Sequence, residues 1–456
     1  MGDMVNEISE KYAKLQFNDL SSEVVDTTKK FIIDTLGCGF AGTKASGSIE
    51  VMNLFASFGG KEEATLFGSG HRLPCHSAAF VNSVLSHALD FDDTLDDAAM
   101  HCYVSVLPAA LSLAEARKAS GKQLITAVAL GVDLSCRLGA AIRTSLSWIR
   151  TATCGSFGSA AAAAKVLNLK QQDMLNTFGV AYSQTSGNAQ CLLDGGLAKR
   201  IQPAFSARAG VLSALMAEMG ITGAREVFEG KFGYFNLYER GAYDRGKCLE
   251  GLGEEFFGMK LSIKPYPSCR MTHSSIDAAL AVKQKYGFSF EEVEKAELFV
   301  SKMSKEMVGK PFAIRQNPQV DAQFSIPYTV SVALTKGKPF IDDFEDAVIC
   351  DEKRKYAAGK INVYASEDIG ERDLKPAVIK VYLKNGDVLT DKIDVLKGHP
   401  ENPLCWEECI RKFKKCTAWG VQKYEDNVID RIVEIVLNLD QIEDVSKIQT
   451  HLLNCN

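Results

Sequence analysis

The residues best suited to chemistry lie in one short stretch of the sequence. His87, Asp90, Asp92 and Asp93 stand close together, and His101 follows shortly after them. Three carboxylates so close in sequence are costly inside a helix unless they are solvated or paired. A solvated acidic face would normally include Lys or Glu, and residues 87–94 contain neither. An exposed surface remains the alternative, but polar groups gathered in this way are more typical of a functional site.

The spacing within this stretch predicts a helix that runs through residues 80–94. Apolar residues recur at helical intervals and would form one stripe, made of Phe80, Val84, Ala88 and Phe91. Polar residues recur in the same way and would form a second stripe, made of Ser83, His87, Asp90 and Thr94. On such a helix, the second stripe would present its side chains on one side, as a binding site requires.

His101 lies just before a second predicted helix, which begins near Val104 and has Pro108 in its first turn. The positive end of a helix dipole disfavours a further positive charge beside it. A neutral imidazole is the form that acts as a general base near neutral pH. His101 is therefore a candidate base, and a histidine held in an ordinary connecting loop is the alternative interpretation.

Two groups of basic residues could bind an anion. Lys199 and Arg200 precede a helix predicted to begin at Pro203, and free amide groups at a helix start favour a carboxylate. Solvated surface cations are the alternative interpretation of this pair. A second group lies where the character of the sequence changes, a common place for ligand sites; it consists of Lys264, Arg270 and His273. With His101, these groups supply enough positive charge for a substrate with two or three carboxylates.

The composition excludes several classes of partner. The chain has 456 residues, 46% of them hydrophobic and 24% charged, and a net charge of −5 without a basic run. Nucleic acid and anionic membranes are therefore not expected as partners. No uninterrupted apolar segment is long enough to span a membrane, and no signal peptide is evident. The 13 cysteines include no Cys-x-x-Cys pair, which indicates a reducing, cytoplasmic compartment.

No cofactor or metal is expected from the motifs. Gly155 and Gly158 precede an alanine run, but no strand comes before them and no Gly-Lys-Ser/Thr follows, so close helix packing explains them better than phosphate binding. The cysteine cluster at 405–416 has no histidine at zinc-ligand spacing. No dinucleotide fingerprint is present elsewhere.

The chain is longer than a single hydrophobic core usually supports, so two domains are expected. Up to about residue 260 the pattern is helical and rich in small residues, which predicts a closely packed bundle. Beyond Pro265, strands are predicted at 296–300 and on both sides of Asn385-Gly386, a strong hairpin signal. Helical stretches near 273–286 and 344–358 complete a small α+β domain. After Pro403 the pattern is helical again.

Five sequence blocks together resemble the MmgE/PrpD family, which includes 2-methylcitrate dehydratases, cis-aconitate decarboxylases and iminodisuccinate epimerase. The blocks are residues 87–111, 153–158, 198–202, 264–278 and 398–413. The resemblance implies a mainly α fold. It consists of a large all-helical domain built from residues 1–262 and 400–456, with a smaller α+β domain inserted at 263–399. The resemblance also implies a homodimer.

The resemblance carries functional residues over to this chain. It implies that the catalytic residues are His101, His273, Asp90 and Lys199. It also matches Thr94 and Tyr328, and with these the predicted substrate-binding residues are Thr94, Arg200, Lys264, Tyr328 and His87. His101 and His273 are expected to be an acid/base pair facing each other across a cleft between the domains. Asp90 would orient an imidazole, and Lys199 would bind a substrate carboxylate, with Arg200 and Lys264.

Two departures from the family pattern bear on the substrate. One additional residue separates Thr94 from His101, and loop 95–100 lacks the usual His-Pro. Ile149 stands where many relatives carry a histidine. The first expectation is a cofactor-independent lyase, a dehydratase or decarboxylase, acting on a small anionic di- or tricarboxylate such as 2-methylcitrate or cis-aconitate. An epimerase of a dicarboxylate such as iminodisuccinate is the alternative, and a non-catalytic anion-binding member is a third.

Overall fold

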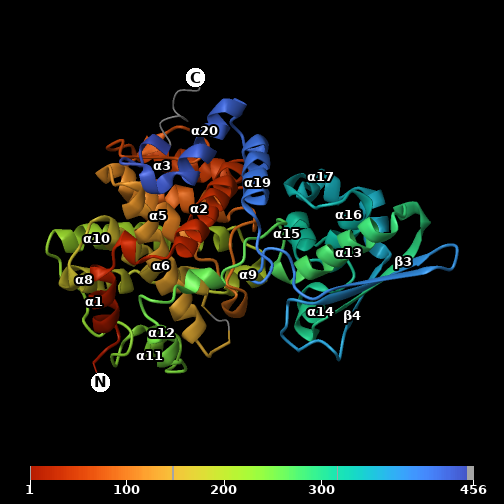
Figure 1. Cartoon of the computed structure of the whole chain (residues 1–456), viewed down its shortest axis with the longest axis horizontal. Coiled ribbons are helices and arrows are strands. Elements are labelled where there is room, and N and C mark those ends of the chain that lie inside the picture. The colour runs from red at the N-terminus through yellow and green to blue at the C-terminus, as the bar shows by residue number, and fades with distance from the viewer. Residues whose placement is uncertain (1, 146–147, 316, 449–456) are drawn as a thin grey trace. The chain divides into compact units, whose positions relative to one another are not determined.

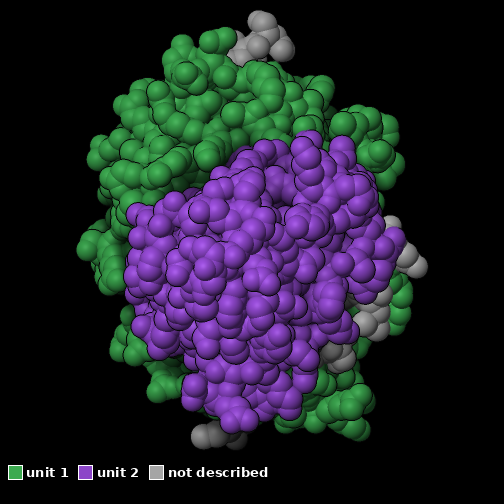
Figure 2. Space-filling model, turned by 90° about the vertical axis from the view of Figure 1, so that its right-hand side faces the viewer, with its two compact units in different colours: residues 1–261, 405–456 green, residues 262–404 purple. Residues whose placement is uncertain are grey.

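The computed structural model describes residues 2–145, 148–315 and 317–448. The chain forms two compact units, coloured separately in Figure 2. Unit 1 consists of Met1–Leu261 and Cys405–Asn456, and unit 2 of Ser262–Leu404. The fold is 57% helical with 9% strand in two small sheets. This confirms the predicted class, mainly α with a smaller α+β part.

The described part of unit 1 is built mainly from helices (Figure 1), with one short hairpin. Its longer helices are α1 (Val5–Lys14), α2 (Ser22–Gly42), α3 (Ser48–Phe58), α4 (Cys75–His87), α5 (Tyr103–Arg117), α6 (Gly121–Ala141), α7 (Arg150–Val166), α8 (Gln171–Tyr182), α10 (Ala198–Glu218), α19 (Trp406–Trp419) and α20 (Asp426–Leu437). Short helices are α9 (Gln190–Asp194), α11 (Tyr234–Tyr238) and α12 (Arg245–Leu249). The hairpin pairs β1 (Ala64–Thr65) with β2 (Arg72–Leu73).

The centre of unit 1 depends on glycines that let helices approach closely. A Cβ added at Gly158 of α7 would lie 1.9 Å from Ser135 Oγ and 2.6 Å from the carbonyl oxygen of Gly131, both on α6. A Cβ at Gly155 would lie 2.6 Å from Ser105 Oγ of α5. Both glycines lie inside α7 rather than in a loop. The prediction that they serve helix packing is therefore confirmed.

The helix predicted over residues 80–94 is wrong in its second half. Helix α4 ends at His87, and Asp90 has a φ of 55°, in the left-handed region that interrupts a helix. Residues 88–102, here called the acidic loop, connect α4 to α5. Helix α5 begins at Tyr103, so Pro108 lies inside it rather than in its first turn.

The C-terminal segment contacts the acidic loop directly. Helix α19 packs against α2, and Lys412 of α19 is buried between them. Its ammonium lies 2.7 Å from Asp34 Oδ1 of α2 and donates to the carbonyl oxygen of Phe91 at 2.7 Å. The same ammonium lies 3.8 Å from the centroid of the Phe91 ring. A residue more than three hundred positions away thus holds the backbone of the acidic loop.

Unit 2 contains a four-stranded sheet in the order β4-β3-β5-β6. Its strands are β3 (Val293–Val300), β4 (Ile361–Ala365), β5 (Ala377–Leu383) and β6 (Val388–Ile393). Strand β3 runs parallel to β4 and antiparallel to β5. Strands β5 and β6 pair antiparallel on either side of Asn385-Gly386, with Gly386 at a φ of 97°, which confirms the predicted hairpin.

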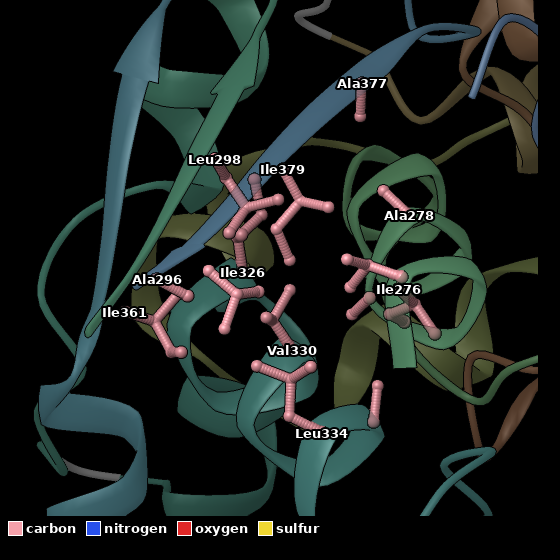
Figure 3. Close-up of a cluster of buried hydrophobic side chains, with 14 of the residues drawn as sticks. Ile276, Ala278, Ala296, Leu298, Ile326, Val330, Leu334, Ile361, Ala377 and Ile379 are labelled. Atoms are coloured by element: carbon pink, nitrogen blue, oxygen red, sulfur yellow. The ribbon is translucent and has the colours of Figure 1, made fainter. Parts of the chain in front are cut away.

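One face of this sheet packs against helices. The helices of unit 2 are α13 (His273–Tyr286), α14 (Lys302–Val308), α15 (Pro318–Gln323), α16 (Ile326–Thr335), α17 (Asp346–Ile349) and α18 (Glu352–Gly359). Figure 3 shows Leu298 and Ile379 of the sheet meeting Ile276 of α13 and Val330 of α16 in one hydrophobic core. Helix α13 matches the predicted stretch 273–286, and it begins at His273.

Among the described residues, one helix is long and apolar enough to cross a membrane by length and composition. This helix is α6, and 94% of its most apolar 18-residue window is buried inside the protein. Burial among the other helices of unit 1 accounts for its apolar sequence.

Lys412→Met is expected to destabilise unit 1 by about 3–5 kcal/mol, because it leaves the buried Asp34 carboxylate without its counter-charge. The double variant Asp34→Leu/Lys412→Met should recover most of this loss, since neither charge then remains buried. Unfolding free energies of the two single variants and the double variant measure the coupling. Equal, additive losses from the two positions would contradict this account.

Candidate active site

Asp93 of the acidic loop caps the start of α5. Its Oδ2 accepts from the backbone amide of Cys102 at 2.7 Å, and its Oδ1 accepts from that of Tyr103 at 3.1 Å. Burial and the neighbouring Asp92 carboxylate raise the pKa of Asp93 to about 7. Asp93 therefore fixes the end of the acidic loop to α5, just after His101.

Asp92 is shared by two imidazoles. Its Oδ2 lies 2.9 Å from Nδ1 of His87 and 3.1 Å from Nδ1 of His101. The two rings lie 5.0 Å apart between centroids. Burial opposes ionisation of Asp92, but the two imidazoles outweigh it and hold the pKa of this carboxyl well below its usual range. Asp92 is thus an ionised acceptor facing both rings.

The two histidines differ in their surroundings. The His87 side chain is 1% exposed, and burial together with the Lys199 charge lowers its pKa to about 4. His87 is therefore neutral at physiological pH. The His101 side chain is 15% exposed, which makes it the more accessible ring.

The additional residue before His101 is absorbed within the acidic loop. The backbone amide of Leu95 donates to the carbonyl of Met100 at 2.8 Å, and Ala99 between them has a φ of 50°. The backbone amide of His101 then donates to Thr151 Oγ1 of α7 at 3.1 Å. His101 is therefore held in place although loop 95–100 differs from the family pattern. Thr94, just before this turn, is buried.

Asp90 pairs with a lysine from α10. Lys199 Nζ lies 3.1 Å from Asp90 Oδ1, and its side chain is 20% exposed. Helix α10 begins at Ala198 rather than at the predicted Pro203, so Lys199 and Arg200 lie within its first turn and not before it. Burial lowers the pKa of Arg200, and the Asp90 carboxylate opposes that effect. The family resemblance implies that Asp90 orients an imidazole. In the structure the carboxylate bonded to the imidazoles is Asp92, which helical spacing had placed off the polar stripe.

Unit 1 therefore brings six of the predicted residues into one region, and adds Asp92 to them. The six are His87, Asp90, Thr94, His101, Lys199 and Arg200. They come from α4 with the acidic loop that follows it, and from α10, which is distant in sequence but packs against α4.

The other predicted residues belong to unit 2. Lys264, Arg270 and His273 are buried there. Nη1 of Arg270 lies 3.2 Å from His273 Nδ1 and donates to the carbonyl of Lys397 at 3.0 Å. His273 Nε2 lies 3.2 Å from the carbonyl oxygen of Ser268. Both ring nitrogens of His273 thus have protein partners, and one contact must break before that nitrogen exchanges a proton with a ligand.

Tyr328 does not join this basic group. It lies at the start of α16 in a separate hydrophobic cluster with Phe344 and Phe312, and its side chain is fully buried. Its hydroxyl donates to the carbonyl oxygen of Asp343. These contacts explain Tyr328 as a core residue and provide no support for the substrate-binding role predicted for it.

One group among the described residues has a composition that could hold a metal ion. It consists of His87, Asp92 and His101, whose ligand atoms all lie within 4.8 Å of one another. Both Nδ1 atoms, however, lie at hydrogen-bond distance from a single oxygen of Asp92. Protonated Nδ1 atoms that donate to a carboxylate account for these distances, and such atoms cannot ligate a metal at the same time.

Comparison with known families identifies the chain. Residues 6–245 match the MmgE/PrpD N-terminal domain, and residues 266–439 match the MmgE/PrpD C-terminal domain. The chain belongs to the MmgE/PrpD family. This MmgE/PrpD protein is 25% identical to a cis-aconitate decarboxylase of Aspergillus terreus, over 99% of this chain and 96% of the relative. It is 26% identical to the cis-aconitate decarboxylase of Homo sapiens, over 98% and 95% of the two chains.

The raised pKa of Asp93 predicts a pH dependence of stability in this MmgE/PrpD protein. The folded state binds the Asp93 proton more tightly than the unfolded state, so stability from this group is lost as pH rises from about 4 towards 7. Asp93→Asn removes that loss. The thermal midpoint of Asp93→Asn relative to wild type should therefore rise between pH 5 and 8, as measured by differential scanning fluorimetry.

The exposed Asp426 gives a matched control, because Asp426→Asn should show no such trend. A constant difference between Asp93→Asn and wild type across this pH range would contradict the assignment.

Proposed function

We propose that this MmgE/PrpD protein is a carboxylate lyase that decarboxylates a small unsaturated tricarboxylate of the cis-aconitate type. Family membership and the names of its relatives support a lyase. The observation that carries the proposal is His101, an accessible imidazole bonded through Nδ1 to Asp92. Lys199 lies close enough for its charge to act on the neighbouring His87.

The chemistry suits this set of side chains. When a carboxylate on the saturated carbon beside a carbon–carbon double bond leaves as CO2, the electron pair of the broken C–C bond forms a new double bond to the neighbouring carbon. The original double bond then takes up a proton at its far carbon, which gives an unsaturated dicarboxylate. His101 would supply this proton as a general acid, and Lys199 with Arg200 would bind the remaining carboxylates. The double bond of the substrate accepts the electron pair, so the proposal includes no organic cofactor.

His273 of unit 2 remains the second acid/base candidate. Its Nδ1 faces Arg270 and its Nε2 faces a backbone carbonyl, so its participation requires a rearrangement within unit 2. Lys264 remains a candidate carboxylate ligand in the same unit. The proposal does not depend on either residue, and kinetics of their variants test them separately.

Turnover in D2O distinguishes the proposed reaction from its alternatives. The protein is incubated with cis-aconitate, 2-methylcitrate and citrate, and products are followed by proton NMR. We expect loss of CO2 from cis-aconitate with one deuterium in the product. Deuterium incorporation into a dicarboxylate without loss of CO2 or water would indicate an epimerase. Release of water alone would indicate a dehydratase, and no turnover of any substrate would contradict a lyase.

Two variants separate chemistry from binding. His101→Gln should lower kcat by roughly 10²–10⁴ while KM changes little, because the ring acts in the proton-transfer step. Lys199→Met should raise KM more than it lowers kcat, because its ammonium binds a carboxylate in both the ground and transition states. Steady-state kinetics measure both. His71→Gln, an exposed histidine of the same unit, is the control.

If His101→Gln retains near-normal kcat, the acid is another residue, and His273→Gln would then be expected to show the larger loss. If Lys199→Met lowers kcat without changing KM, Lys199 acts in the chemical step instead.

A further inference from the structure

We propose that Asp92 is the positioning residue of this site, holding the proton of His101 on Nδ1 so that Nε2 is the atom that exchanges protons with the substrate. This inference rests on the proposed function for its substrate, but the position of the proton can be observed without any substrate.

The assignment follows from what surrounds His101 Nδ1. This atom lies 3.1 Å from Asp92 Oδ2, and it also contacts the backbone carbonyl oxygen of Asp93. Both neighbours are acceptors without a proton, since Asp92 is ionised. A nitrogen facing two acceptors must be the donor, so Nδ1 carries the hydrogen. Nε2 of His101 makes no hydrogen bond to any described residue, so it is the nitrogen left to take up and release the catalytic proton.

Free histidine does not favour this form by itself; the environment of the ring decides which nitrogen is protonated. An aspartate that performs this role in hydrolases can be replaced by asparagine with little change in geometry, yet the rate falls about 10⁴-fold because the wrong tautomer forms. Asp92 has the corresponding relation to His101. It has no contact with substrate to make, and acts through the ring.

His87 limits the charge of the cluster. Its Nδ1 lies 2.9 Å from the same oxygen of Asp92, and the ring is neutral at physiological pH. One carboxylate therefore faces one neutral imidazole and one imidazole that can gain a proton. When His101 is protonated, Asp92 neutralises the imidazolium, and His87 adds no competing positive charge.

The other carboxylate oxygen makes Asp92→Asn an informative variant. Oδ1 of Asp92 is buried and has no hydrogen-bond partner among the described residues. If the asparagine oxygen took the place of Oδ2, the NH2 group would occupy the buried position of Oδ1, where it has no acceptor. If the NH2 group instead faced the histidines, its two N–H bonds could donate to the two Nδ1 atoms. The second orientation leaves fewer buried N–H groups without an acceptor, and it moves both imidazole protons to Nε2.

The direct test is nitrogen-15 NMR of the full-length protein labelled at histidine. The chain has 7 histidines, and the signals of His87 and His101 are assigned by their loss in His87→Gln and His101→Gln. We expect Nδ1 of both rings to carry a proton in the wild-type protein, with Nε2 of His87 unprotonated near pH 7.5. Wild-type spectra that show His101 as the Nε2–H tautomer would overturn the proposal, and this readout requires no Asp92 variant.

Kinetics provide the second test. Asp92→Asn should lower kcat by about 10²–10⁴ with little change in KM, and its spectrum should show Nε2–H tautomers. Asp92→Glu retains a carboxylate acceptor and should recover part of the lost kcat together with the Nδ1–H tautomer. Asp426→Asn is the matched control on an exposed aspartate. An Asp92→Asn protein with at least half of the wild-type kcat would overturn the proposal.

Two further outcomes distinguish a failure of the proposed function from a failure of the role proposed for Asp92. If the wild-type protein converts no tested carboxylate but shows the Nδ1–H tautomers, the proposed function fails while the role of Asp92 in holding the proton stands. If the purified protein contains one equivalent of a metal ion that is lost in Asp92→Asn, the carboxylate is a metal ligand, and the positioning role is overturned.

Discussion

The constraint on which this structure depends is the burial of three carboxylates within four positions of one loop. Each must find its own compensating partner, because a buried charge without one is strongly destabilising. In the structure the three side chains point towards different partners. Asp90 pairs with Lys199 of α10, Asp92 accepts from the two imidazoles, and Asp93 accepts from the first amides of α5. The left-handed backbone at Asp90, where φ is 55°, ends the helix and lets Asp92 turn back towards the two imidazoles.

The partners of the acidic loop come from several helices of unit 1. The loop follows α4 and precedes α5, Lys199 of α10 pairs with Asp90, and Lys412 of α19 binds the carbonyl of Phe91. The chain therefore completes unit 1 only with the segment that begins at Cys405. Lys412 and Thr151, from two different helices, bind the backbone of the loop at Phe91 and His101. Lys199 of a third helix pairs with the Asp90 carboxylate.

Much of the fold could be predicted from local signals. The mainly helical class, the hairpin at Asn385-Gly386 and the close packing at Gly155 and Gly158 each depend on residues near one another in sequence, and each is confirmed. These features follow from the helical periodicity of apolar residues, from the turn geometry of Asn-Gly and from the absence of a side chain on glycine. The candidate residues of unit 1 were also found from the sequence, but their catalytic and binding roles remain predictions.

The sequence did not reveal what each acid does. Helical spacing grouped Asp90 with His87 and left Asp92 on another face, whereas the left-handed backbone at Asp90 ends the helix and turns Asp92 towards the rings. Tyr328 shows that a motif match can also identify a residue whose contacts are those of the hydrophobic core. A family motif identified it, but its hydroxyl is bonded to Asp343 and its ring is part of a hydrophobic cluster. Both outcomes depend on how the backbone turns and on which side chains then meet, and neither helical spacing nor a motif specifies these.

Whether the acidic loop and α10 bind the substrate is best tested by a crystal structure of the protein with a saturated, unreactive tricarboxylate such as propane-1,2,3-tricarboxylate. We expect one ligand carboxylate within hydrogen-bond distance of Lys199 Nζ, with Nε2 of His101 facing the ligand and Nδ1 remaining on Asp92. A ligand bound away from the acidic loop and α10, or a His101 ring whose Nδ1 faces the ligand, would contradict this expectation.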